Sequence, residues 1–372
     1  MKIPLMKPFV NDEIKNAVYN VLDNERFVLG ESVYKFEEEL AHYFDVDYAI
    51  TVSSGTHALH FALLAINIKE NDKVITTPFS FIATANAILY VGSEPIFADI
   101  KDDTLNIDPK EIVRKLSSTV KAILPVHIFG YPADMDDIIE IANKNSMKVI
   151  EDACQAHGAT YNGKKVGSIG DVGCFSFYPS KNMTVCGDGG AVITNDDKIA
   201  RTVIKLRDCG RISKYEHDII GYTARLNTIN AAIGRIQLKY LNQWNEIRRK
   251  IAKIYNKHLS DIEEIILPPL ETQKVKPVYH MYVIRTKYRE KLKRWLEEKG
   301  IECGIHYPIP IHLQPIYKKL YKYSEGHYPK SERVCKTCLS IPMHPFLKDE
   351  EIKYICEKIR DFYSTRSNLE NG

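Results

Sequence analysis

The sequence has no apolar run long enough to cross a membrane, and its first residues lack the apolar core of a secretory signal peptide. We therefore expect a cytoplasmic protein with no membrane partner. A net charge of +3 over 372 residues gives no broad basic surface for nucleic acid. The dinucleotide-binding fingerprint GxGxxG is also missing, which argues against an oxidoreductase that uses a nicotinamide cofactor.

The cysteines are scattered, and only Cys335 and Cys338 form a CxxC motif. One such motif supplies half of the ligands of a tetrahedral zinc site, so we expect no bound metal. A long chain without a secretory signal is expected to keep its thiols reduced and mostly buried.

Short β-rich runs alternate with helical segments from about residue 48 to residue 210. The expected strands are 48–52, 73–77, 95–98, 121–126, 148–150, 174–177 and 191–194. This alternation is typical of an α/β fold in which both faces of a mostly parallel sheet are covered.

The length of the chain exceeds the size at which one hydrophobic core stops growing, so we expect two domains. Apolar residues at steps of three and four predict a long connecting helix from Ile229 to Leu259. The later segments predict a smaller α/β unit with strands at 282–284, near 305 and at 339–341, and helices at 289–299 and 349–362. We place the large domain, with an N-terminal segment, at 1–245 and the small domain at 246–372.

Lys181 follows the apolar run 174–177 and precedes a glycine turn. A lysine at the mouth of an α/β sheet can be desolvated enough to react as an amine. Upstream, strand 148–150 ends on acidic residues that include Asp152. A Schiff-base lysine with a carboxylate for a pyridinium nitrogen is the pairing that pyridoxal phosphate requires. Taken alone, Lys181 would be interpreted as a solvated surface lysine, as most lysines are.

Residues 53–56, Ser-Ser-Gly-Thr, lie at a predicted strand-to-helix junction. Free backbone N–H groups and the helix dipole make such a junction an anion site, although the hydroxyls could equally cap the helix. Ser176, five residues before Lys181, adds a hydroxyl that can reach the same phosphate.

Three more side chains follow expected strands. Phe81 can stack on a flat heteroaromatic ring or can belong to the core, and Gln155 and His157 come just after Asp152. Since α/β sheets bind ligands where their parallel strands end, we expect these groups in one crevice.

Several ordered and well-spaced motifs lie between Ile3 and Ile359. They are Ser54–Leu59, Pro125–Gly130, Glu151–Gly158, Ser176–Lys181, Asn230–Gly234, His306–Gln314 and Leu339–His344. Together they resemble the DegT/DnrJ/EryC1/StrS family of sugar aminotransferases, which depend on pyridoxal 5′-phosphate.

The resemblance implies a fold-type I pyridoxal-phosphate enzyme and a homodimer with active sites at the subunit interface. Lys181 would bind the cofactor as a Schiff base, and Asp152 would pair with the pyridine nitrogen as the second catalytic residue. The remaining contacts it implies are Phe81 on the ring face, Gln155 at the ring hydroxyl, and Gly55, Thr56 and Ser176 at the phosphate.

One position departs from the family pattern. Thr223 stands where many relatives carry an asparagine that reaches the partner subunit's phosphate. Threonine is shorter but still has a hydroxyl. We therefore expect Thr223 to contact the cofactor, as the asparagine of those relatives does.

The stretch from His306 to Pro315 contains three prolines. Prolines restrict the backbone, so this loop can present His306, Tyr307 and His312 rigidly to a sugar substrate. The alternative is a structural strand edge, because loops near a site also need packing.

These features predict amino transfer, with glutamate as the expected donor, to a keto-sugar on a nucleotide diphosphate. The expected acceptor is a UDP- or dTDP-linked 3-keto or 4-keto hexose, in the synthesis of amino sugars for surface polysaccharides. One alternative is a pyridoxal-phosphate-dependent dehydratase, although such relatives carry histidine in place of Lys181. The other is a non-catalytic regulatory protein of the same fold, because fold alone does not prove activity.

Overall fold

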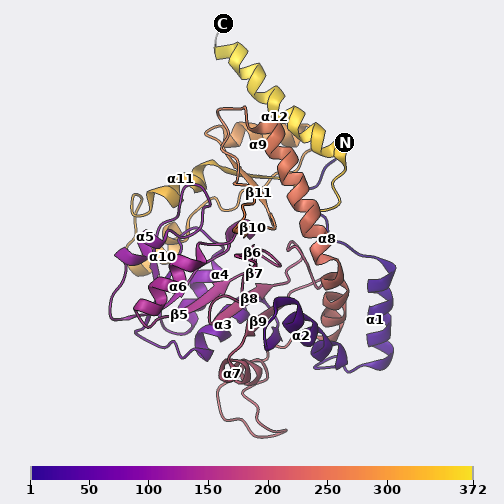
Figure 1. Ribbon diagram of the computed structural model, residues 1–372, viewed down its shortest axis with the longest axis vertical. Coiled ribbons are helices and arrows are strands. Elements are labelled where there is room, and N and C mark those ends of the chain that lie inside the picture. The colour runs from indigo at the N-terminus through magenta and orange to yellow at the C-terminus, as the bar shows by residue number, and fades with distance from the viewer. Residues whose placement is uncertain (1, 371–372) are drawn as a thin grey trace.

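The computed structural model describes residues 2–370, with side chains described up to residue 365. Its centre is a seven-stranded sheet with strand order β1-β9-β8-β5-β4-β2-β3 (Figure 1). The strands are β1 (Tyr48–Val52), β2 (Lys73–Thr76), β3 (Glu94–Phe97), β4 (Val120–Leu124), β5 (Lys148–Asp152), β8 (Val172–Ser176) and β9 (Gly190–Thr194). Neighbours from β3 to β8 are parallel, whereas β9 is antiparallel to both β8 and β1. The predicted α/β fold with a mostly parallel sheet is confirmed.

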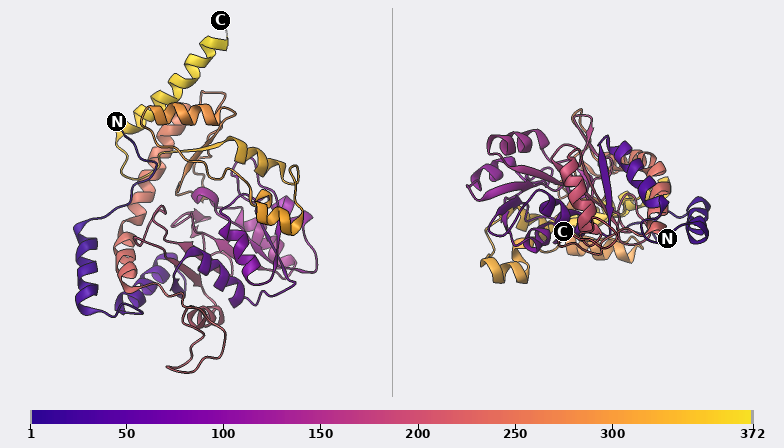
Figure 2. Two further views of the ribbon diagram at one scale, coloured as in Figure 1. Left: turned by 180° about the vertical axis from the view of Figure 1, so that it is seen from behind. Right: turned by 90° about the horizontal axis from the view of Figure 1, so that it is seen from below.

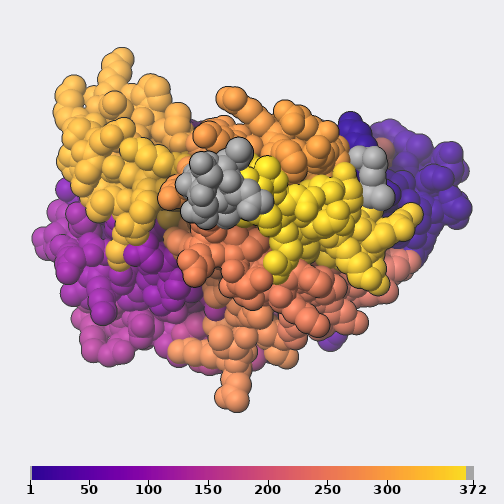
Figure 3. Space-filling view, turned by 90° about the horizontal axis from the view of Figure 1, so that it is seen from above, coloured from indigo at the N-terminus to yellow at the C-terminus, as the bar shows by residue number. Residues whose placement is uncertain are grey.

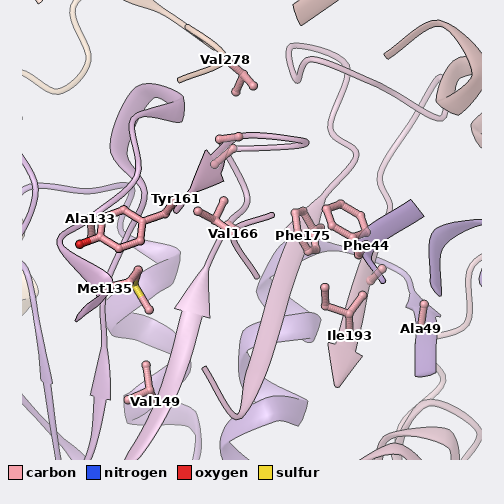
Figure 4. Packing of buried hydrophobic residues seen from close by; sticks show 14 of the residues in the cluster. Phe44, Ala49, Ala133, Met135, Val149, Tyr161, Val166, Phe175, Ile193 and Val278 are labelled. Carbon is pink, nitrogen blue, oxygen red and sulfur yellow. The ribbon is translucent and has the colours of Figure 1, made fainter. Parts of the chain in front are cut away.

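Both faces of this sheet are buried. Successive side chains of a strand point to opposite faces, so each strand contributes to two cores. In β9, Ala191 and Ile193 belong to one hydrophobic core, and Val192 belongs to the other. Figure 4 shows the first of these cores, where Phe44 and Phe175 face one another. Their ring centroids lie 4.4 Å apart. The near-continuous apolar strands are therefore explained by cover on both sides.

Helices supply that cover. Helices on one face contribute to the core around Phe175, and helices α3, α4 and α7 contribute to the core around Val192. The helices are α1 (Asp12–Asn24), α2 (Glu31–Phe44), α3 (Gly55–Ala65), α4 (Ala83–Tyr90), α5 (Pro109–Arg114), α6 (Met135–Lys144), α7 (Asp197–Arg207), α8 (Thr228–Leu259), α9 (Arg289–Glu298), α10 (Pro315–Tyr321), α11 (Pro329–Thr337) and α12 (Asp349–Glu370). The long helix predicted from Ile229 to Leu259 is thus found as α8.

The chain beyond α8 packs around a separate core. Tyr255 of α8, Tyr282 of β11 (Tyr282–Arg285) and Ile341 of β12 (Cys338–Ile341) are buried there. The N-terminal segment reaches the same core, where Ile3 forms a bridge with Ile301. Figure 2 accordingly shows the N-terminus beside the start of α12, and Figure 3 shows α12 across the top of the molecule.

The expected strand near Ile305 is only an isolated bridge between Gly304 and Ser340. A three-stranded sheet of β10 (Val275–Lys276), β6 (Thr160–Tyr161) and β7 (Lys164–Lys165) was not predicted. Helix α8 crosses the proposed domain boundary at residue 245, and the division into 1–245 and 246–372 stays a prediction. The last two residues of the second predicted domain lie outside the described chain.

Within residues 2–370, none of the helices combines the length and the apolar character that a membrane span requires.

Candidate active site

A pocket of about 460 Å³ opens where β5 and β8 end. It brings together nine of the residues singled out from the sequence. These are Gly55, Thr56, Phe81, Asp152, Gln155, Ser176, Lys181, His306 and Tyr307. Residues from four strand-following segments and from the C-terminal part of the chain therefore meet in one place, as expected for an α/β sheet.

Lys181 lies in the turn that follows β8. Its backbone N–H donates to the carbonyl of Tyr178 at 2.8 Å. The next residue, Asn182, donates through Nδ2 to Asn245 Oδ1 and to the Val278 carbonyl, each at 3.0 Å. Desolvation by the surrounding protein lowers the pKa of Lys181 below its ordinary value of 10.5. The loop is thus anchored, and its lysine is biased toward the neutral amine.

Asp152 is the last residue of β5 and is only 4% exposed. Its Oδ2 accepts a hydrogen bond from Thr84 Oγ1 at 2.7 Å, and its Oδ1 accepts one from the Cys154 backbone N–H at 3.2 Å. A carboxylate has about four acceptor positions, so this one keeps capacity for a further donor from the pocket. A protonated ring nitrogen is a donor of the required kind.

Helix α3 begins at Gly55 and points its N-terminus at the pocket lining. The side chain of Ser54 caps the helix by accepting from the His57 N–H at 3.1 Å. A Cβ atom at Gly55 would lie 2.7 Å from Ser176 Cβ and 3.0 Å from Cys154 Sγ. Glycine therefore lets the start of α3 approach Ser176 closely. The free N–H groups of the helix then lie near a serine hydroxyl, a combination that suits a phosphate.

Phe81 and Tyr307 form an aromatic wall of the pocket. Phe81 is 54% exposed, and its ring centroid lies 6.1 Å from that of Tyr307. Gln155 is held from two sides, because its Oε1 accepts from the Phe129 N–H at 2.9 Å and its Nε2 donates to Tyr307 Oη at 3.4 Å. A flat ring placed here would meet an accessible aromatic face and an amide.

His306 also lines the pocket, and its Nδ1 lies 2.9 Å from Ser340 Oγ in β12. His157, expected near the ring, is fully buried and does not line the pocket. It packs against Phe175 and Phe177, and burial lowers its pKa to about 3.

The structure does not bring His312 to the pocket. This side chain is completely buried, and its Nε2 lies 3.0 Å from Glu332 Oε1 of α11. The prolines do fix the backbone, but the short 3-10 helix at Ile311–Leu313 turns His312 inward. Here the imidazole is a buried hydrogen-bond partner of Glu332, and burial lowers its pKa. A contact of His312 with the sugar stays a prediction.

Thr223 also lies outside this pocket. It is exposed, and its Oγ1 is 3.4 Å from Cys209 Sγ at the base of the loop between α7 and α8. Figure 1 shows this loop projecting from the body of the molecule below α7. Every residue from 211 to 220 is exposed. Its contact with a cofactor stays a prediction, since within one chain Thr223 touches no part of the pocket.

Among the pocket residues to which sequence reasoning gave no role are Thr84, Cys154 and His280. Thr84 is on α4 and contacts Asp152, so it could be found only once α4 was placed against β5. Cys154 lies inside a recognised motif but carries no distinctive spacing of its own. His280 precedes β11 and belongs to none of the motifs.

Cys335 and Cys338 are both buried, and burial raises the pKa of each thiol. Among residues 2–370, no cluster of three or more metal-ligating side chains is present.

The residues present fit pyridoxal 5′-phosphate. Gly55 lets a helix N-terminus approach the Ser176 hydroxyl, Asp152 offers a buried acceptor, and Lys181 is a desolvated amine. The class that this fold and site define is therefore the fold-type I, pyridoxal-phosphate-dependent enzymes. More specifically, the chain belongs to the DegT/DnrJ/EryC1/StrS aminotransferase family, which matches residues 8–360.

Individual relatives cover almost the whole chain. A protein of Geobacillus stearothermophilus called "Pleiotropic regulatory protein" is 42% identical over 94% of both chains. A UDP-N-acetyl-3-dehydro-alpha-D-glucosamine 3-aminotransferase of Acidithiobacillus ferrooxidans is 39% identical, again over 94% of both. The crystal structure of DesV from S. venezuelae, in complex with a ketimine intermediate, has a TM-score of 0.94 at 35% identity. It covers 97% of this chain and 98% of DesV.

Proposed function

We propose that this protein is a pyridoxal-phosphate-dependent aminotransferase that moves an amino group from glutamate to a keto-sugar on a nucleotide diphosphate. The observation that carries the proposal is the meeting of a desolvated lysine, Lys181, and a buried carboxylate, Asp152, in one pocket. Membership in an aminotransferase family and relatives named for nucleotide-sugar amination support it.

When bound, pyridoxal phosphate supplies an electron sink for the bond that breaks at the substrate carbon. Lys181 would hold the cofactor through its Nζ. Once free, this amine would take the proton from the reacting carbon of the donor as a base and give it back as an acid. Asp152 would keep a proton on the ring nitrogen, and the hydrogen bond from Thr84 fixes the orientation of its carboxylate.

The other pocket residues bind and orient the cofactor. Gly55, Thr56 and Ser176 hold the phosphate at the start of α3, where the backbone N–H groups and the helix dipole favour an anion. Phe81 stacks on the ring, and Gln155 contacts the ring hydroxyl. These roles are supported by the pocket geometry and by the family resemblance.

The sugar binds beside His306 and Tyr307, which face the pocket from the C-terminal part of the chain. The Acidithiobacillus relative is named for amination at C3 of a UDP-linked sugar. This supports a 3-keto sugar on UDP as the first substrate to test, with 4-keto and dTDP-linked sugars next. The cytoplasmic location remains a prediction.

The active unit is a homodimer in this proposal. Loop 211–220 is exposed and projects from the body of the protein, and it carries Ile220 at 89% exposure. A loop of this kind is expected to be covered in the working assembly. In such a dimer Thr223, at the base of the loop, would contact the partner subunit's phosphate site.

A regulatory role is the second candidate, because the Geobacillus relative is named as a regulatory protein. The pocket argues for catalysis, since it retains both Lys181 and Asp152. The deciding experiment incubates the protein with glutamate and a panel of UDP- and dTDP-linked 3-keto and 4-keto hexoses. Mass spectrometry should detect an amino sugar with the parent and none with Lys181→Ala. A protein that binds the cofactor but aminates no sugar would favour the regulatory role.

A further inference from the structure

His280 lies on the wall of the same pocket as Lys181 and has no role in the mechanism so far. It lies two residues before the start of β11 and is only 1% exposed. Arg248 of α8 holds the main chain here, because its Nη1 donates to the carbonyls of Tyr279 at 3.1 Å and His280 at 3.4 Å. The imidazole is therefore presented from a fixed backbone rather than from a mobile loop.

The surroundings of His280 favour a neutral ring. Burial lowers its pKa well below the ordinary 6.5, and the nearby guanidinium of Arg248 lowers it further. The charged and titratable groups that face it are Lys181, Arg248, His157 and His306. A protonated imidazole would thus be both desolvated and repelled.

The position of the proton on this neutral ring follows from the burial of Nδ1. That atom is completely buried and has no hydrogen-bond partner among the described residues. A buried N–H without a partner costs more than an unpartnered acceptor and is rarer in proteins. The proton is therefore placed on Nε2, the nitrogen left to face the pocket. His280 then offers the pocket an uncharged donor, as neutral imidazoles do in some other enzymes.

The charge of the lining explains why such a donor is useful. The described residues around the pocket include no arginine and no lysine other than Lys181. An amino-acid donor carries a carboxylate on the carbon that reacts, whereas a keto-sugar carries uncharged ring atoms there. A fixed cation at that point would be left unpaired whenever the sugar is bound, at the cost of a desolvated charge. A neutral N–H donor serves both substrates in turn.

We propose that His280 Nε2–H donates a hydrogen bond to the carboxylate on the reacting carbon of the amino donor. This inference rests on the proposed aminotransferase function. It makes His280 a residue that recognises the donor, while His306 faces the sugar. The affinity for the amino donor should therefore not rise as the pH is lowered to about 6, because the imidazole acts in its neutral form.

The two half-reactions separate these roles. In His280→Leu, a lost hydrogen bond to a charged group should weaken the glutamate half-reaction by roughly 10- to 100-fold in kcat/KM. His280→Gln keeps an N–H near the position of Nε2 and should recover most of the loss. The sugar half-reaction should change by less than about threefold in both. His42→Gln, at an exposed site in the last turn of α2, is the matched control.

Nitrogen-15 NMR of the histidine rings in the cofactor-loaded protein gives a readout apart from activity. The signal that disappears in His280→Gln should show a neutral ring with its proton on Nε2 between pH 6 and 8. It should shift when α-methylglutamate is added, since this analogue binds but has no α-proton to lose. A protonated ring, a proton on Nδ1, or equal loss of both half-reactions in His280→Leu would overturn the inference. If the parent itself fails to react with glutamate, the proposed function fails with it.

Discussion

Thr84 Oγ1 donates a 2.7 Å hydrogen bond to Asp152 Oδ2, and so joins helix α4 to the end of strand β5 at the floor of the pocket. Ser80 Oγ lies 2.8 Å from the same threonine hydroxyl. All three side chains are buried. The carboxylate that should pair with the cofactor ring is therefore oriented by a hydroxyl that no sequence motif revealed.

Replacing Thr84 tests this orientation. Thr84→Val keeps the shape of the side chain but removes the donor, so the cofactor should be released roughly 10- to 100-fold more readily, as expected for a lost bond to a charged group. Thr84→Ser should retain most of the affinity. Cofactor loss on dialysis, followed by absorbance, measures the effect. Equal release from the parent and Thr84→Val would show that Asp152 is oriented by other groups.

The lowered pKa of Lys181 predicts a stability effect in the cofactor-free protein. The folded state binds this proton more weakly than the unfolded state does, so the contribution of Lys181 to stability improves as pH rises toward 10.5. Lys181→Met should therefore melt at a higher temperature than the parent at pH 7. The difference should shrink as the pH is raised to 9.5, as followed by calorimetry. A difference that grows with pH would contradict the assignment.

His306 and His312 should behave differently, although both come from one proline-rich stretch. His312→Ala removes the partner of buried Glu332 and should cost about 1–3 kcal/mol of stability, with little effect on turnover per folded molecule. His306→Ala should fold normally and slow the sugar half-reaction. Thermal melts and single-turnover absorbance measure the two effects. A stable His312→Ala with a specific defect in the sugar half-reaction would contradict this assignment and support a sugar contact by His312.

The projecting loop gives a prediction about assembly. Ile220→Glu places a charge on a side chain that is 89% exposed in one chain and is expected to be covered in the dimer. The variant dimer should dissociate at a protein concentration roughly tenfold or more above that at which the parent dimer dissociates. Activity should fall as the dimer dissociates. Sedimentation at several concentrations checks this. A parent that is fully active as a monomer would rule out a shared site.

The sheet and most of the pocket were accessible from the sequence, because strand-ending motifs such as Glu151-Asp152 and Ser176 have fixed positions in an α/β fold. The antiparallel direction of β9 could not be predicted from the sequence, because the turn after Lys181 does not indicate how β9 pairs with the other strands. The buried setting of His312 could not be predicted, because proline spacing indicates stiffness but not the direction in which a side chain faces. His280 was missed because its setting depends on Arg248 and Lys181, which are distant in sequence.

The attachment of the cofactor to Lys181 is the central claim, and borohydride trapping tests it most directly. The cofactor-loaded protein is reduced, digested with trypsin and mapped by mass spectrometry. The account predicts a single phosphopyridoxyl adduct, on Lys181, and none in Lys181→Ala. An adduct on Lys164 or Lys165 of β7, or an unchanged yellow colour in Lys181→Ala, would contradict it.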